Sequence, residues 1–197
     1  TGAKGFIWGQ RSNKISYSNT KLLNKALKNC KLCISNSQIG IEAIKKIYQN
    51  HNSITFHKVA NGIEIAKPLL KKEDWKQNLG IDDNTKVVLM IANFSEKLGK
   101  DQKTLIRAWK IVQMEKPNSL LILAGRFDNH IEEYIQLSLE LKILNSIRFL
   151  GKVTDISGLI GTSDIIAHSS KNEGSPNAIL EGMKCKKPIV ATNIPGV

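Results

Sequence analysis

Two carboxylates eight positions apart, Glu173 and Glu181, are the residues whose type and spacing first suggest chemistry in this sequence. Between them lie Gly174, Ser175 and Pro176, a run that favours a turn followed by the first turn of a helix. Carboxylates accept hydrogen bonds from hydroxyl groups, and the amides of a helix N-terminus bind anions. We therefore expect Glu173 in a loop and Glu181 in the next helix, with both facing one crevice.

Apolar runs on both sides of this segment predict strands. Residues 164–167 precede it and residues 188–192 follow it. In an open α/β sheet, ligands bind at the loops that leave the carboxyl ends of the strands. The segment from Ser170 to Glu181 is therefore expected to lead from a strand through a loop into a helix at the ligand-binding edge of a sheet.

The rest of the chain repeats this alternation of short apolar strands and amphipathic helices. The predicted strands are 32–35, 54–59, 86–92, 119–124, 146–150, 164–167 and 188–192. The predicted helices are 20–29, 37–48, 75–79, 101–115, 130–142, 155–161 and 176–185. The pattern is typical of a parallel sheet with helices on both faces, so it predicts a Rossmann-like α/β fold.

The sequence also predicts local details of these elements. Ser37 is expected to cap the helix that follows it, and Asn61-Gly62 is a turn signal at the end of a strand. In helix 101–115, the residues expected to point inward are Leu105, Ala108, Trp109 and Val112. A polar connection over residues 64–83 indicates a domain boundary, which we place between residues 62 and 63.

Four loops follow predicted strands and should share one edge of the sheet: 93–101, 125–128, 151–155 and 169–177. The sequence lacks the Gly-x-Gly-x-x-Gly fingerprint of dinucleotide-binding folds and the Gly-x-x-x-x-Gly-Lys-Ser/Thr motif of P-loop proteins. It therefore argues against a nicotinamide-dependent oxidoreductase and against a P-loop nucleotide hydrolase.

The net charge of +12 raises the question of a nucleic-acid partner. Nearly all the cations are lysines scattered over the predicted helices, with arginine only at 11, 107, 126 and 148. A nucleic-acid binder concentrates arginine and lysine on one face, often with aromatic residues between them. The pattern therefore disfavours nucleic acid, and attraction to phosphorylated ligands or anionic lipid headgroups fits it better.

Cys30, Cys33 and Cys185 cannot all pair with one another, which favours a reducing compartment. Cys30 and Cys33 have the spacing of half a zinc site or of a redox motif, but no second pair of ligands has matching spacing. Two buried structural thiols are the favoured interpretation. For His168, just before the Ser170–Glu181 segment, we favour a structural role over that of a catalytic base.

The segment EGSPNAILEGM at residues 173–183, followed by KPIVAT at 187–192, resembles the E-x7-E region of retaining GT-B glycosyltransferases, family 4 in particular. Further segments resemble motifs of the same family in order and spacing: 35–37, 61–64, 100–108, 149–153 and 170–174. The resemblance covers essentially the whole chain.

This resemblance implies a GT-B fragment that is incomplete at both ends. Residues 1–62 would be the C-terminal part of the N-terminal, acceptor-side Rossmann-like domain, and residues 63–197 a truncated donor-binding domain. The parent would be a retaining hexosyltransferase that moves a sugar from a nucleotide-diphosphate sugar to a glycan or lipid-linked acceptor in surface polysaccharide synthesis. The stretch alone is expected to be inactive.

The resemblance also implies that no cofactor and no metal are needed. The expected location is cytoplasmic, with peripheral contact with anionic membrane at its inner face and no nucleic-acid partner. A noncatalytic nucleotide or nucleotide-sugar binding module on the same fold is the alternative.

By the family's pattern, Glu173 would hold hydroxyls of the donor sugar and Glu181 the ribose hydroxyls. Lys100 would supply positive charge to the leaving diphosphate, which can replace a metal. The backbone at the helix N-terminus would cradle the diphosphate through Gly174, Ser175, Pro176, Asn177 and Ala178. The base would be lined by Lys152, Val153 and Arg126.

Three positions depart from the family's pattern. Asn93 stands where arginine is common, so phosphate binding depends more on Lys100, with Arg126 as a substitute. Lys97 is a rival for the phosphate role. Lys186 stands where a glycine is expected near a helix end, which costs free energy if this residue is left-handed.

Overall fold

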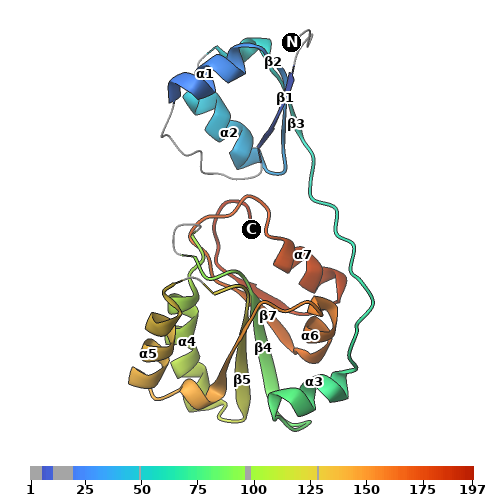
Figure 1. Cartoon of the computed structure of the whole chain (residues 1–197), viewed down its shortest axis with the longest axis vertical. Coiled ribbons are helices and arrows are strands. Elements are labelled where there is room, and N and C mark those ends of the chain that lie inside the picture. Colours follow the sequence, from blue (N-terminus) through green and yellow to red (C-terminus); the bar gives the residue numbers. More distant parts are fainter. Residues whose placement is uncertain (1–5, 11–19, 49, 96–98, 128) are drawn as a thin grey trace. The chain divides into compact units, whose positions relative to one another are not determined.

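The structure is a computed structural model that describes residues 6–10, 20–48, 50–95, 99–127 and 129–197. The chain divides into two compact units (Figure 1). Unit 1 is made of Thr1–Gly62, Asn172–Pro176 and Asn193–Val197. Unit 2 is made of Ile63–Lys171 and Asn177–Thr192.

Unit 1 is built on a parallel three-stranded sheet in the order β1-β2-β3. The strands are β1 (Phe6–Gln10), β2 (Cys30–Ser35) and β3 (Thr55–Lys58), joined by α1 (Thr20–Lys28), α2 (Gln38–Ile47) and a 3-10 turn, η2 (His51–Ser53). As predicted, Ser37 caps α2, because its Oγ accepts a hydrogen bond from the amide of Gly40 at 3.2 Å.

The two N-terminal cysteines lie in the core of unit 1. Cys30 and Cys33 are 2% and 0% exposed and pack with Leu27, Ile44 and Tyr48. Burial, and then the neighbouring Cys30, raise the pKa of the Cys33 thiol to about 11. A thiol with so high a pKa stays protonated at neutral pH, which agrees with the interpretation as structural thiols.

Unit 2 is built on a parallel five-stranded sheet in the order β6-β5-β4-β7-β8. Its strands are β4 (Lys86–Ile91), β5 (Ser119–Ala124), β6 (Ile147–Gly151), β7 (Ile165–His168) and β8 (Ile189–Ala191). Along the chain, strands add first on one side of β4 and then on the other. The order therefore reverses between β4 and β7, the point where open α/β sheets bind ligands.

Helices cover both faces of this sheet, as predicted. On one face lie α4 (Gln102–Glu115) and α5 (Ile131–Glu140), and on the other lie α3 (Lys72–Leu79), α6 (Ile156–Thr162) and α7 (Asn177–Lys184) (Figure 1). A further 3-10 turn, η4 (Leu144–Ser146), leads into β6.

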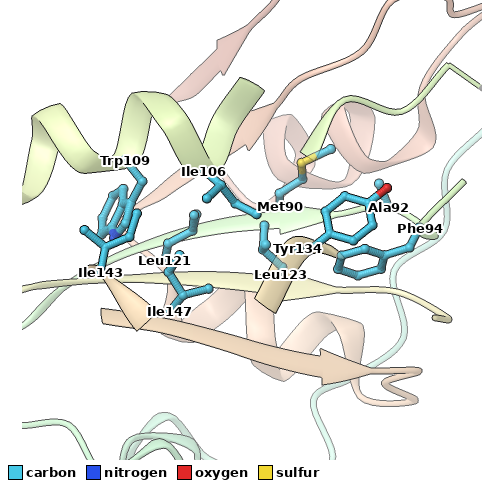
Figure 2. Packing of buried hydrophobic residues seen from close by; sticks show 10 residues of the cluster. All are labelled: Met90, Ala92, Phe94, Ile106, Trp109, Leu121, Leu123, Tyr134, Ile143 and Ile147. Carbon is cyan, nitrogen blue, oxygen red and sulfur yellow. The ribbon is translucent and has the colours of Figure 1, made fainter. Parts of the chain in front are cut away.

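The interior strand β5 is buried on both faces, so its side chains alternate between two cores. Leu121 and Leu123 pack under α4 and α5 with Trp109 and Tyr134 (Figure 2). The other side chains of β5, such as Ile122, pack under the helices of the opposite face. This explains the continuous apolar run over 120–124 in the sequence.

The inward face of α4 differs from the predicted one. Trp109 is buried as expected, but Ile106 rather than Ala108 or Val112 is the other large buried apolar residue of this helix. Ala108 and Val112 are exposed. Periodicity alone did not show which side of α4 faces the core, because apolar residues lie on nearly all sides of this helix.

The turn predicted at Asn61-Gly62 was wrong, since the chain runs on from β3 without a turn. The Asn61 side chain instead accepts a hydrogen bond from Asn36 Nδ2 and donates one to the carbonyl of Ser175, both at 3.2 Å. Among the residues that the structure describes, no helix is long and apolar enough to cross a bilayer.

Two helices of unit 2 end with a lysine in the left-handed conformation. Lys142 after α5 has a φ of 58°, and Lys186 after α7 has a φ of 57°. After α7, the amides of Lys186 and Lys187 donate to the carbonyls of Met183 and Gly182, the hydrogen-bond pattern of a Schellman motif. The left-handed conformation considered for Lys186 from the sequence is therefore present.

Candidate functional site

The loops that leave β4 and β7 are joined by hydrogen bonds at the reversal point of the unit 2 sheet. Lys100 pairs with Ser170 in a short antiparallel bridge. The amide of Lys171 donates to the carbonyl of Gly99 at 2.7 Å, and Ser170 Oγ donates to the same carbonyl at 2.9 Å. Lys100 is thereby held at the carboxyl edge of the sheet, where a ligand is expected.

Thr192, at the end of β8, fixes the other side of Ser170. Its Oγ1 accepts from the amide of Ser170 at 3.2 Å and donates to the carbonyl of Ser170 at 2.9 Å. Sequence reasoning assigned no role to Thr192. A polar, β-branched residue at the end of an apolar strand was the only signal for it.

A strongly basic pocket of about 290 Å³ lies beside Lys100. Its lining residues are Lys100, Asp101, Gln102, Lys103, Thr104, Arg107, Tyr134 and Lys171. The carboxylate of Asp101 caps α4 by accepting from the amide and the hydroxyl of Thr104, at 3.2 Å and 3.0 Å. Four cations and a single carboxylate make this pocket suited to an anion.

Glu181 lies half-buried on α7 and lines a second pocket of unit 2, of about 190 Å³. The other lining residues are Glu64, Ile65, Ala66, Thr154, Ile156, Ser157 and Ile160. Lys184 Nζ donates to the carbonyl of Ile63 at 2.9 Å, which ties the segment after Gly62 to α7. Burial raises the pKa of the Glu181 carboxyl because it disfavours the charged form. Hydrogen bonds donated by ligand hydroxyls would stabilise the carboxylate there.

Glu173 and the residues up to Pro176 belong to unit 1, and Asn177, the first residue of α7, belongs to unit 2. Glu173 is only 8% exposed. Gly196 has a φ of 95° and packs against the carbonyls of Glu173 and Gly174, so closely that a Cβ at residue 196 would collide with them. The backbone that carries Glu173 is therefore shaped by a glycine that sequence reasoning did not single out.

The Asn93 side chain contacts the backbone of Arg126. The Arg126 amide donates to Asn93 Oδ1 at 2.9 Å, and the Arg126 carbonyl accepts from the amide of Phe94 at 2.9 Å. The buried Gln102 donates from Nε2 to the carbonyl of Asn93 at 3.1 Å. The Asn93 oxygen thus joins two loops, and the Arg126 side chain is exposed.

The remaining predicted residues of unit 2 lie in the loop after β6. Lys152 is exposed, and Val153 packs against the core under α3 and α6. Lys97 lies outside the described residues. His168, at the end of β7, is 2% exposed, as expected for a structural histidine.

Asp155 is the most heavily hydrogen-bonded residue of this loop, and sequence reasoning gave it no role. It accepts from Trp75 Nε1 at 2.9 Å and from the amides of Leu69, Leu70 and Gly158 at 3.1 Å each. Burial alone would raise the pKa of Asp155, but these hydrogen bonds outweigh it and lower the pKa to about 2. Its position before α6 signalled a helix cap, whereas its distant partners left no local signal.

A larger pocket, of about 870 Å³, lies in unit 1 and contains none of the predicted site residues. It is lined by Asn24, Lys25, Lys28, Ile47, Tyr48, Asn50 and Ser53. It lies beside α1 and the C-terminal end of α2, not at the carboxyl ends of strands. Size alone is therefore a weaker guide to the site than position at the edge of a parallel sheet.

Known proteins resemble this chain over most of its length. An uncharacterised glycosyltransferase of Methanocaldococcus jannaschii is 30% identical over 156 residues, which are 76% of this chain and 37% of the relative. The N,N'-diacetylbacillosaminyl-diphospho-undecaprenol alpha-1,3-N-acetylgalactosaminyltransferase of Campylobacter jejuni is 29% identical over 183 residues, 92% of this chain and 42% of the relative. The chain spans less than half the length of these relatives.

Solved structures show the same fold. Anabaena Alr3699/HepE, in a crystal structure with UDP-glucose, superposes with a TM-score of 0.83 at 25% identity, covering 98% of this chain and 54% of that one. The model of the family described as glycosyl transferases group 1 matches residues 71–197. The chain therefore belongs to glycosyl transferases group 1 and has the α/β fold of the GT-B glycosyltransferases.

Proposed function

We propose that this protein is part of a retaining glycosyltransferase that moves a sugar from a nucleotide-diphosphate sugar to a glycan or lipid-linked acceptor in surface polysaccharide synthesis. The observation that carries the proposal is the hydrogen-bonded junction of the β4 and β7 loops, which holds Lys100 at the reversal point of the sheet. The HepE complex with UDP-glucose supports a nucleotide-sugar donor. In this proposal residues 1–62 are acceptor-side and residues 63–197 bind the donor.

Lys100 would act on the leaving nucleoside diphosphate. Negative charge builds up on the diphosphate as its bond to the sugar breaks, and a cation already held in place stabilises that charge without reorganisation. The bridge to Ser170 holds the backbone of Lys100 in this way. The neighbouring Lys171 adds to the positive field, so we propose a reaction that needs no metal and no cofactor.

Glu181 would bind the ribose. A carboxylate can accept hydrogen bonds from two neighbouring hydroxyls at once, and these bonds favour its charged form against the effect of burial. The backbone of Gly174, Ser175, Pro176, Asn177 and Ala178, which leads into α7, would receive the diphosphate.

Glu173 would accept hydrogen bonds from hydroxyls of the donor sugar, and its buried setting would strengthen them. The base would be lined by Lys152, Val153 and Arg126. Since the Val153 side chain packs against the core, its backbone is the part best suited to contact a base.

The acceptor would be lipid-linked at the cytoplasmic face of the membrane, with peripheral contact to anionic lipid. The diphospho-undecaprenol in the name of the Campylobacter relative supports a lipid-linked acceptor, and the net charge of +12 supports attraction to an anionic surface.

A noncatalytic nucleotide or nucleotide-sugar binding module is the second candidate. The observation that favours it is Asn93, whose side-chain oxygen is engaged by the amide of Arg126, so this position supplies no charge to a phosphate. Both candidates predict that a nucleotide or nucleotide sugar binds, and only the first predicts that a sugar is transferred to an acceptor.

Calorimetric titration with UDP, GDP and ADP, alone and as nucleotide sugars, tests the donor site. We expect one nucleotide to bind, and Glu181→Gln and Lys100→Ala each to weaken it roughly ten- to hundredfold, the cost of a hydrogen bond to a charged group. Lys31→Ala, an exposed lysine of unit 1, is the control and should bind as the wild type does. Equal binding by all four proteins would refute the assignment.

Transfer is tested in the full-length parent. With acceptor present, nucleoside diphosphate should be released, and Glu173→Gln should slow this release while nucleotide binding persists. Binding without release under any acceptor would instead favour the noncatalytic module.

A further inference from the structure

The outward face of α4 carries large apolar side chains at its most exposed point. Ile111 is 63% exposed and Met114 is 73% exposed. At 3.6 residues per turn they lie about 160° and 140° around the helix from the buried Trp109. They therefore point away from the core that α4 covers, where a helix of this kind normally carries polar residues.

Cations flank these two apolar residues. Arg107 lies one turn before Ile111, and Lys110 lies one turn before Met114. Lys116 follows the end of the helix and is exposed. The acid on this stretch is Glu115, so the outward face of the C-terminal half of α4 combines apolar and cationic side chains with a net positive charge.

The same face leads into the basic pocket at the start of α4. Lys103 and Arg107 line that pocket of about 290 Å³, together with Lys171 of the loop after β7. Lys103 is also paired with Glu133 at 2.6 Å, so its charge is partly compensated. The face thus offers positively charged groups for phosphates at one end and apolar groups at the other.

We propose that the outward face of α4, formed by Arg107, Lys110, Ile111, Met114 and Lys116, docks on the surface of an anionic lipid bilayer. The cations would meet the headgroup phosphates, and the two apolar side chains would enter the boundary with the acyl chains. This inference rests on the membrane contact of the proposed function and not on its transfer chemistry.

Charge and size favour a bilayer over a protein partner. A stable protein interface covers about 800 Å² on each partner, which two projecting side chains do not supply. A bilayer adds an attraction for every cation near its surface, without requiring a complementary shape. A second copy of this chain would bring a face of the same positive sign, which the cations oppose.

Vesicle cosedimentation of the protein tests the proposal. The vesicles are phosphatidylcholine with about one third phosphatidylglycerol, compared with phosphatidylcholine alone. We expect binding to the anionic vesicles. Arg107→Gln/Lys110→Gln should lower the partition coefficient about 25-fold, roughly fivefold for each cation. Ile111→Ser/Met114→Ser should lower it roughly tenfold.

Matched controls carry the same chemical changes elsewhere. Lys28→Gln/Lys31→Gln removes two exposed cations from unit 1, and Leu139→Ser removes an exposed apolar side chain from α5. Both should bind vesicles nearly as the wild type does. All substituted residues are exposed except Lys110, which is half-buried, and unchanged thermal unfolding would show that each variant folds.

Several results would overturn the docking face: no binding to anionic vesicles, equal binding by the α4 variants, or an equal loss in the controls. Self-association in sedimentation velocity that Ile111→Ser/Met114→Ser abolishes would assign the face to a second copy and also overturn it. Calorimetry with UDP separates this proposal from the donor site. Vesicle binding that depends on α4 would support the face even if UDP did not bind.

Discussion

At the scale of single residues, the charged side chains of Asp155 and Lys100 in unit 2 differ in their surroundings. Asp155 is buried and satisfied by donors from Trp75, the segment before α3, and α6. Lys100 is held through its backbone beside other cations. The first arrangement stabilises the fold, and the second gathers positive charge at the carboxyl edge of the unit 2 sheet.

The depressed pKa of Asp155 predicts a loss of stability in acid. The pKa is lowered from 3.8 to about 2 in the folded state, so its ionised form contributes stability above pH 3.8 that is lost as the pH falls through 2. The contribution is about 2 kcal/mol at pH 7, of which about half is lost by pH 3.

Urea unfolding of the wild type and of Asp155→Asn at both pH values measures this contribution. The variant should be less stable at pH 7, and the difference between the two proteins should shrink by about 1 kcal/mol at pH 3. The same difference at both pH values would contradict the assignment, because other carboxyls titrate equally in the two proteins.

Gly196→Ala should disturb the backbone of Glu173. A Cβ at residue 196 meets the carbonyls of Glu173 and Gly174, and the φ of 95° disfavours any other residue. The wild type should bind the nucleotide sugar more tightly than the nucleotide alone, because in our proposal Glu173 contacts the sugar. We expect Gly196→Ala to bind both with about the same affinity. Gly62→Ala is the control, since a Cβ there meets nothing within 4 Å. A retained preference for the nucleotide sugar in Gly196→Ala would contradict this role.

At the scale of elements, helix ends show where sequence and conformation conflict. Lys142 and Lys186 are left-handed, a conformation that costs residues with a Cβ about 1–2 kcal/mol. Replacing either by glycine removes this cost. Because glycine itself loses more backbone entropy on folding, the net stabilisation of unit 2 should be about 0.5–1 kcal/mol.

Lys110→Gly is the matched control, because Lys110 lies inside α4. It should destabilise unit 2 by about 1 kcal/mol. Denaturant unfolding of the three variants checks the signs. A destabilising Lys186→Gly would show that the Lys186 side chain matters more than its backbone conformation.

The elements themselves followed from the sequence, whereas their junction did not. The continuous apolar run of 120–124 indicated a strand buried on both faces, and the structure has β5 there. The bridge between Lys100 and Ser170 joins residues 70 positions apart, and no local pattern encodes such a contact. Local sequence patterns identified the loops, but the loops after β4 and β7 meet only because β4 and β7 are neighbours in the sheet.

At the scale of the whole molecule, unit 1 is formed by three separate stretches of the chain. It leaves unit 1 after Gly62, returns for Asn172–Pro176, and returns again for Asn193–Val197. The polar connection after Gly62 marked the first change of unit in the sequence. The two later returns are short and lie within a segment that reads as one continuous α/β pattern, so periodicity did not reveal them.

Ligand binding should stabilise the unit that holds the pocket of Glu181. Nucleoside diphosphate at 100 times its dissociation constant adds about 2.7 kcal/mol, which corresponds to a rise of roughly 5–10 °C in the midpoint. Calorimetric scans at the same ligand concentration should show this rise for the wild type and at most about half of it for Glu181→Gln. An equal rise in both proteins would mean that the nucleotide binds elsewhere.

The most direct test of the donor site is a backbone NMR titration of this chain with UDP. The amides that should shift are those of Lys100, Ser170, Gly174, Ser175, Asn177, Ala178 and Glu181. Shifts confined to the pocket of unit 1 around Lys28 and Tyr48, or no shifts on saturation, would contradict a nucleotide site at the carboxyl edge of the unit 2 sheet.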